Sequence, residues 1–309
     1  MVGHGQMRTN KNEQGNEQRV ASLADAQGGG PAVLRTLLGA QLRRLRADRG
    51  ISREEAGYQI RASDSKMSRL ERGRVGFKER DVADLLTIYG VHDDAERAAL
   101  LELARRANEP VWWQSYSDIV PSWFEVYVGL EDGASRIRTY EVQFVPGLLQ
   151  TEEYARAVTV LGHQAAAPEE VDRRVALRLT RQNVLERDDA PHYWAVVDEA
   201  ALRRPLGGPK VMRAQLTRLI EATSMPNVTL QVVPFERGGH AAAGGQFSIL
   251  RFAEPDMPDV VYMEQLTSAV YLDKREDVDR YLAVMEQLCV EAEQPVKTTE
   301  RLHNMIKAL

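Results

Sequence analysis

The sequence predicts two folded domains, an all-α domain near the N-terminus and then an α+β domain with an antiparallel sheet. Its 309 residues are enough for two domains, because single hydrophobic cores rarely grow that large. Apolar residues recur at helical spacing from 33 to 107, whereas strand-like runs and helical stretches alternate from 135 onward. Charge separates the same regions: residues 33–80 carry a net charge of +7 in a chain whose total is −5, which leaves −12 for the rest.

Residues 1–31 are expected to form a disordered leader that ends in the glycine-rich stretch "AQGGGP". The leader has no apolar core segment, so it is not a secretory signal, and no run of the chain approaches the roughly 18 apolar residues of a membrane helix. The single cysteine, Cys289, lies in an apolar helical setting and is expected to be buried. One thiol cannot form an internal disulfide, so a cytoplasmic location is expected by default.

The first domain is expected to span 32–109 and to begin with a helix over 33–48 that ends before Gly50. Ser52 and Glu55 have the spacing of a capping box, which predicts the start of a second helix. After the short connection "RAS", Ser63 is a suitable N-cap for a third helix over 64–72, which ends before Gly73. A fourth helix is expected within 80–90 and a fifth within 93–107.

The second domain is expected to span 110–295, followed by a C-terminal helix within 296–309. Strands are expected near 135–144, 192–198, 228–235, 246–252, 259–264 and 269–273, and the last three are spaced like an antiparallel meander. Helices are expected after Pro121, from Thr151, and over 168–187, 209–223 and 274–292.

Five short helices with a tight connection between the second and the third are the layout of a helix-turn-helix domain. The run "LRRLRADRGISREEAGYQIRASDSKMSRLERGR" (42–74) resembles the XRE, or lambda-repressor-like, family of transcriptional regulators. The chain departs from the commonest pattern at Gly57 and Tyr58, and its turn "RAS" has no glycine. The resemblance implies binding to double-stranded DNA, as a homodimer on a pseudo-palindromic site.

In such a domain the second helix of the motif enters the major groove, where its N-terminal side chains reach base edges. The resemblance places Asp64, Ser65 and Arg69 there. Arg69 follows Ser65 by four residues and shares its helical face, and an arginine on guanine contributes about 1–3 kcal/mol of discrimination. Ser65 contacts either base or phosphate. Asp64 either accepts a hydrogen bond from cytosine or only supports the helix N-terminus.

Phosphate contacts are expected from five basic side chains, for each of which the alternative is a solvated surface charge. They are Arg53, Lys66, Arg72, Arg74 and Lys78. Glu71 has another expected role: the resemblance implies that it pairs with Arg46 of the first helix and holds the two helices together. Loss of one partner from a buried pair costs about 3–5 kcal/mol.

The segment 112–158, with the later "HYWAVVDEAALRRPLGG" and the strand meander, resembles the C-terminal domain of actinobacterial WhiJ-like regulators. This resemblance implies a regulator that is often encoded beside a small partner protein in an antitoxin-like arrangement. An alternative main role is therefore the binding of that small protein. The resemblance supplies no ligand.

An aromatic cluster at the start of the second domain has two readings. It either lines a pocket or partner groove, or forms core between the two domains. Its members are Trp112, Trp113, Tyr116, Trp123, Phe124 and Tyr127. The glycine-rich stretch 236–246 lacks the Gly-Lys-Ser/Thr of a phosphate-binding loop, which favours a mobile hairpin loop. The six histidines are scattered and no catalytic or metal-binding motif occurs, so neither an enzyme nor a cofactor is expected.

Overall fold

The computed structural model describes residues 30–255 and 257–309. The chain divides into an N-terminal unit, Met1–Val111 with Ala253–Met257, and a C-terminal unit, Trp112–Phe252 with Pro258–Leu309. The expected leader falls mostly on residues 1–29, outside the described part. Its last residue, Pro31, is the first residue of a helix instead, because proline suits the first helical turn.

The N-terminal unit contains all five expected helices. They are α2 (Pro31–Asp48), α3 (Arg53–Gln59), α4 (Asp64–Glu71), α5 (Glu79–Ile88) and α6 (Asp94–Ala107). Side chains cap three of them as the sequence predicts: Ser52 accepts from the N–H of Glu55, Ser63 from that of Lys66, and Asp93 from that of Glu96. These caps fix where α3, α4 and α6 begin.

Two glycines allow α2 to pack against the end of α4. A Cβ on Gly39 would lie 2.6 Å from the carbonyl oxygen of Leu70. Gly73 follows α4 with a φ of +66°, and a Cβ there would lie 2.5 Å from the backbone nitrogen of Thr36. Larger residues would push the helices apart, so both positions depend on glycine. The packed interior includes the fully buried Leu38 and Leu42.

The C-terminal unit is an α+β structure in which helices surround a six-stranded sheet. Its strands are β1 (Arg136–Glu141), β2 (His192–Asp198), β3 (Val228–Val233), β4 (Phe247–Arg251), β5 (Val260–Glu264) and β6 (Ala269–Leu272). Its longer helices are α7 (Ser122–Asp132), α8 (Glu152–Gly162), α9 (Pro168–Gln182), α11 (Pro209–Ala222), α12 (Arg275–Glu291) and α13 (Pro295–Ala308). The short α10 (Glu199–Arg203) was not expected from the sequence.

The sheet is mixed, which corrects the expectation of an antiparallel sheet. Its order is β3-β2-β1-β4-β5-β6. β4, β5 and β6 form the predicted antiparallel meander, whereas β1, β2 and β3 run parallel. Helices α8 and α9 connect β1 to β2, and α10 and α11 connect β2 to β3, because parallel neighbours need such long crossovers. The stretch 236–246 is also not a hairpin loop, since β3 and β4 are not neighbours.

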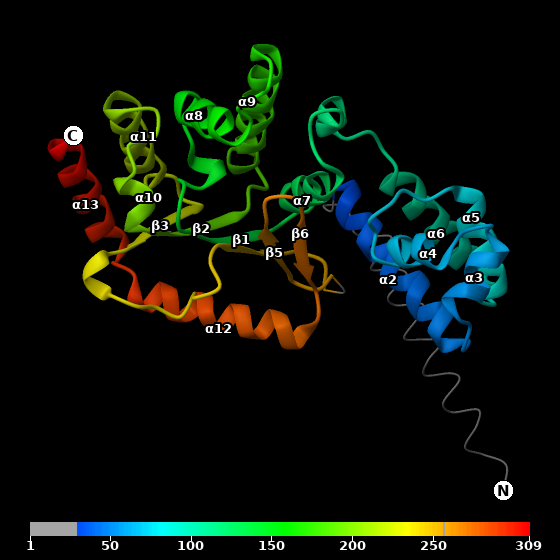
Figure 1. The fold of residues 1–309 in the computed structure, drawn as a ribbon. Coiled ribbons are helices and arrows are strands. Elements are labelled where there is room, and N and C mark those ends of the chain that lie inside the picture. The colour runs from blue at the N-terminus through cyan, green and yellow to red at the C-terminus, as the bar shows by residue number, and fades with distance from the viewer. Residues whose placement is uncertain (1–29, 256) are drawn as a thin grey trace, which may run out of the picture. The chain divides into compact units, whose positions relative to one another are not determined.

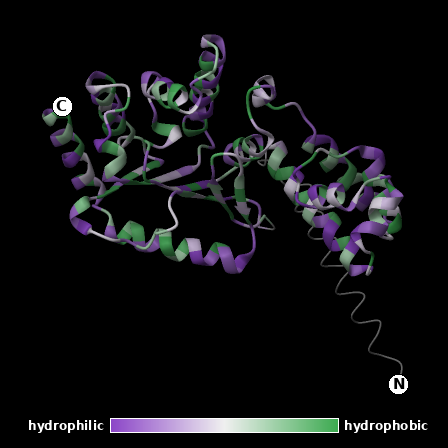
Figure 2. Cartoon of the chain, viewed as in Figure 1, coloured by the Kyte–Doolittle hydropathy of each residue, from purple (hydrophilic) through white to green (hydrophobic). Residues whose placement is uncertain are grey.

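Helices cover both faces of the sheet. Figure 1 shows α12 along one face and α8, α9 and α11 over the other. Tyr140 and Val196 point to the α12 face, where they pack with Met285 and Leu288 of that helix. The helices carry both hydrophilic and hydrophobic residues, as expected when one side of a helix is buried (Figure 2). Cys289 is half-buried beside this core, and burial raises the pKa of its thiol.

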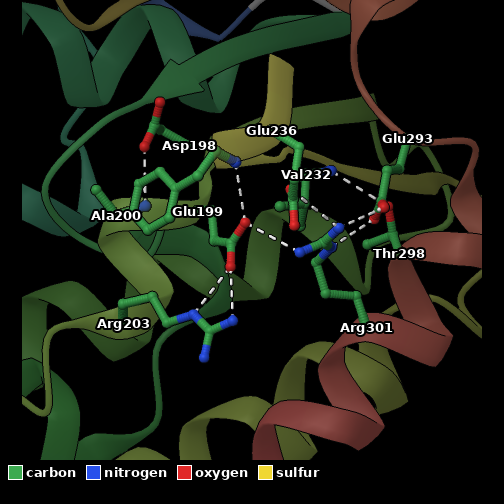
Figure 3. Close-up of polar contacts among 10 residues, drawn as sticks. Asp198, Glu199, Ala200, Arg203, Val232, Glu236, Glu293, Thr298 and Arg301 are labelled. Carbon is green, nitrogen blue, oxygen red and sulfur yellow. Dashed lines mark hydrogen bonds and ion pairs between the residues drawn. The ribbon is translucent and has the colours of Figure 1, made fainter. Parts of the chain in front are cut away.

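A network of charges fixes the C-terminal helix α13, which lies against α11 and β3. Glu199 is buried and accepts hydrogen bonds from Arg203, from Arg301 of α13 and from the backbone N–H of Phe235 (Figure 3). Arg301 also binds both carboxylate oxygens of Glu293, at 2.9 and 2.8 Å. The helix is thus part of the C-terminal unit. None of the helices in the described residues is long and apolar enough to cross a membrane.

Candidate nucleic-acid interface

The turn between α3 and α4 brings the two helices into close contact. A Cβ on Gly57 would lie 2.5 Å from the carbonyl oxygen of Ala62, so the unusual glycine in α3 makes room for the turn. Arg61 takes the left-handed conformation, with a φ of 54°, in the turn that lacks a glycine. Such a conformation costs a residue with a side chain about 1–2 kcal/mol. The α3–α4 packing therefore holds Arg61 in it.

Helix α4 buries one side and exposes the other. Met67 and Leu70 are buried in the domain core. Asp64, Ser65 and Arg69 are exposed on the other side. Within the described residues, the side chain of Arg69 makes no hydrogen bond or ion pair, so its guanidinium is available to an outside partner.

The start of α4 is braced by a contact that the sequence did not predict. The Arg53 guanidinium lies 3.2 Å from Asp64 Oδ1 and donates to Ser68 Oγ, also at 3.2 Å. Arg72 donates to Ser68 Oγ and to the carbonyl oxygen of Ser68. Of the basic side chains expected at phosphates, Arg53 therefore also holds α3 against α4, whereas Arg72 folds back onto its own helix.

The remaining basic residues differ in how much they are engaged within the protein. Lys66 Nζ lies 3.8 Å from Oδ2 of Asp81, whose side chain is buried. Arg74 and Lys78 are exposed in the segment that leads from α4 to α5. Together they place positive charge around the exposed side of α4.

Arg46 and Glu71 join α2 to the end of α4. Arg46 Nε lies 2.5 Å from Glu71 Oε1, and Arg46 Nη2 lies 3.0 Å from Glu71 Oε2. Arg46 also donates to the carbonyl oxygen of Ile51, at 2.7 Å. The hydrogen bonds that Arg46 donates to Glu71 raise the pKa of Arg46. Burial and the nearby charge of Glu71 raise the pKa of Tyr89. The pair ties α4 to α2 and so to the rest of the unit.

This geometry presents the polar N-terminal half of a short helix from a rigid helical frame, with basic residues beside it. It agrees with the comparison to known proteins, in which residues 37–100 match a family described as a helix-turn-helix domain. The N-terminal unit therefore contains a helix-turn-helix domain of the DNA-binding type.

A second match covers residues 124–304, more than half of the chain, and is to a family described as a domain of unknown function, DUF5753. The chain belongs to this family. No curated protein and no solved structure matches the chain.

The aromatic cluster, for which the sequence allowed either a pocket or a core, is divided: two of its members line a cavity and the others do not. Phe124 and Tyr127 of α7 line a cavity of about 220 Å³. Trp112 instead packs edge-on against Trp113 and donates to Asp132 Oδ1 at 3.3 Å. Tyr116 and Trp123 are half-buried and do not line this cavity.

The charged residues of this cavity were not identified from the sequence as candidates for a site. Glu131, Glu141, Arg178 and Arg181 all line it. Arg181 binds Glu131 through two hydrogen bonds of 2.8 and 2.9 Å. Burial alone would lower the pKa of Arg181, but the charge and hydrogen bonds of Glu131 raise it. In the sequence these residues look like ordinary surface charges, Glu141 of a strand and the others of helices, and no motif marks them. The described residues contain no group of three or more His, Cys, Asp and Glu side chains that would hold a metal ion.

Proposed function

We propose that this member of the DUF5753 family is a sequence-specific transcriptional regulator that inserts residues 64–72 into the major groove of double-stranded DNA. The observation that carries the proposal is the exposed Arg69 beside Ser65 on α4 of a helix-turn-helix domain. The protein acts by binding rather than by catalysis. Arg69 reads bases, while Arg72, Arg74 and Lys78 neutralise phosphates.

The test compares fluorescence anisotropy with DNA from upstream of the protein's own gene and with random DNA, at physiological salt. Arg69→Ala should lower affinity for the specific site by about 1–3 kcal/mol and reduce the preference over random DNA. Lys78→Ala is the matched control, because loss of a phosphate contact weakens binding to both DNAs alike. Lys78 is preferred to Arg53 for this purpose, since Arg53 also pairs with Asp64. Equal affinity of the wild-type protein for both DNAs would refute sequence-specific binding.

We also propose that the protein binds its site as a homodimer, because one short recognition helix gives limited specificity and symmetric half-sites extend it. Sedimentation of the complex on a palindromic site should give two protomers per duplex. A single protomer on the intact site would contradict this.

The alternative is an antitoxin-like protein that holds a small partner protein. The specific feature in its favour is strand β6, which lies at an edge of the sheet, where a partner strand can add through backbone hydrogen bonds. Leu266, just before it, is fully exposed. Co-expression with the product of a neighbouring small gene should yield a stable complex. Replacing Ala269 in β6 with proline should release the partner, because the hydrogen-bonded pair Gln265–Ser268 at the turn leaves the Ala269 N–H pointing to the open edge.

A further inference from the structure

The cavity in the C-terminal unit lies at the end of β1, between the sheet and helices α7 and α9. Its lining comes from β1, β2, β4 with the preceding Gln246, β5, α7, α8, α9 and the segment 144–150. Thr139 pairs with Ser248 and Ser248 with Tyr262 across the strands, so these three side chains share the sheet face that borders the cavity. Glu264 lines the cavity and is exposed, so the cavity reaches the surface there.

Most charged groups around the cavity have a partner within the protein. Glu131 and Arg181 satisfy each other through two hydrogen bonds. Glu264 accepts a hydrogen bond of 2.9 Å from the Tyr262 hydroxyl. Glu131 and Arg181 therefore leave little bonding capacity for a ligand, whereas Glu264 keeps acceptor capacity where the cavity reaches the surface.

Two groups of opposite charge remain unsatisfied. The Glu141 carboxylate makes no hydrogen bond or ion pair with any described residue. Arg178 donates one hydrogen bond, of 2.9 Å, to Gln150 Oε1, and its other guanidinium N–H groups have no acceptor in the described part of the chain. The two groups also form no ion pair with each other. Both side chains are half-buried in the cavity wall, where they keep only part of their hydration, so a ligand that supplies both an anion and a cation would pair with both.

Aromatic side chains form another part of the wall. Tyr127 stacks on Tyr262, with ring centroids 4.1 Å apart, and Phe124 and Tyr193 lie beside the same cavity. A cavity of about 150 Å³ can hold a benzene molecule. The volume here, about 220 Å³, therefore suits a ring or branched apolar group with a few polar atoms attached.

We propose that this cavity binds a small zwitterion with an apolar body, such as a free aromatic or branched-chain amino acid. Arg178 receives the carboxylate and Glu141 receives the ammonium group, while the tyrosine stack contacts the apolar body. The site is independent of the DNA-binding helix, so it goes beyond the proposed regulatory function.

The protonation of Glu141 should make the ligand affinity of the site depend on pH. Burial, followed by repulsion from Glu264, raises the pKa of Glu141 to about 8, although Arg178 and Arg181 oppose the shift. The other titratable groups around it are Glu131 and Tyr127 of α7, Tyr154 of α8, Tyr193 of β2 and Tyr262 of β5. An ammonium ligand favours the ionised carboxylate, so its binding should release a proton at pH 7. Its affinity should rise between pH 6 and pH 8.

The experiment is isothermal titration calorimetry of the full chain with L-phenylalanine and with L-leucine. Phenethylamine, which lacks the carboxylate, and N-acetyl-phenylalanine, which lacks the ammonium, are the matched probes. Glu141→Gln and Arg178→Gln test the two ends of the site. Arg174→Gln is the control variant, because Arg174 lies one turn earlier on α9, pairs with Glu170 and does not line the cavity.

At least one amino acid should bind, and both site variants should weaken it tenfold or more, as expected for loss of a charged hydrogen bond. Phenethylamine and N-acetyl-phenylalanine should bind at least tenfold more weakly than L-phenylalanine. Arg174→Gln should bind as the wild-type protein does, and Glu141→Gln should lose the rise in affinity between pH 6 and pH 8. A melting curve for each variant confirms that it is folded.

Three results would overturn the proposal. The first is no binding of either amino acid at about 10 mM. The second is binding of phenethylamine or N-acetyl-phenylalanine as tight as that of L-phenylalanine. The third is unchanged binding by a folded Glu141→Gln variant. DNA affinity is measured on the same samples. A protein that binds its specific DNA but none of the amino acids would overturn the ligand proposal and leave the proposed regulatory function intact.

Discussion

Arg69 and Glu71 are two residues apart on α4, yet they face opposite environments. Arg69 is exposed and makes no hydrogen bond or ion pair in the described part of the chain, whereas Glu71 is only 5% exposed and binds Arg46. Removal of an exposed charge changes the free energy of unfolding little. Removal of one partner from a buried pair lowers it strongly, because the other charge stays buried without a partner. Position within one turn of helix therefore decides whether a charged residue serves recognition or stability.

This contrast predicts different effects of two substitutions. Glu71→Ala should lower the free energy of unfolding by about 3–5 kcal/mol, because Arg46 loses its buried partner. Arg69→Ala, the matched control on the same helix, should change it by no more than about 0.5 kcal/mol. Thermal and denaturant unfolding of the full chain measure both. Equal melting temperatures for the two variants would contradict the structural role of the pair.

At the scale of elements, helix α13 is held by charges rather than by apolar contacts alone. Glu199 of α10 is 1% exposed and is joined to Arg301 of α13 at 3.0 Å. Burial raises its pKa, but the N–H of Phe235 and the charges of Arg203 and Arg301 outweigh burial, and the net pKa of Glu199 is lowered. Since the pKa is lower in the folded protein than in the unfolded chain, ionised Glu199 stabilises the fold.

This stabilisation should depend on acidity. It is fully present above the ordinary glutamate pKa of about 4.3 and is lost as the pH falls through the lower, folded value. Glu199→Gln should therefore reduce the melting temperature at pH 7 and have a much smaller effect near pH 3. Glu153→Gln, at an exposed position of α8, is the control and should change the melting temperature little at either pH. A pH-independent loss in Glu199→Gln would show that packing, not charge, fixes α13.

At the scale of the whole molecule, positive and negative net charge lie in different parts of the chain. The basic stretch 33–80 carries +7, and the remainder of the chain carries −12. The positive field is thus confined to the helix-turn-helix domain, and an overall acidic chain is compatible with DNA binding. Salt screens such fields, which makes the ionic-strength dependence of binding a direct measure of the phosphate contacts.

The expected dependence can be estimated from the five basic residues assigned to phosphates. Arg53 and Lys66 already pair with acidic residues of the protein, so between three and five contacts per protomer should displace counterions. The slope of log K against log salt should then be about −3 to −5 per protomer. Lys78→Ala should make it shallower by about 1. A slope near zero in the wild-type protein would rule out binding through phosphates.

The sequence by itself determined the features that depend on near neighbours. Ser52, Ser63 and Asp93 cap helices where predicted, because a cap needs only the next three residues. The helix-turn-helix domain, and the strands of the second domain, followed from local periodicity in the same way.

Only the tertiary structure decided which distant residues meet. Parallel pairing of β1 with β2 joins residues more than 50 positions apart, and short strand-like runs do not specify it. Glu141 and Arg178 line one cavity because β1 and α9 pack together, although each looks like a surface charge in the sequence. Burial sets the cost of an unpaired charge, and burial is a property of the packed molecule.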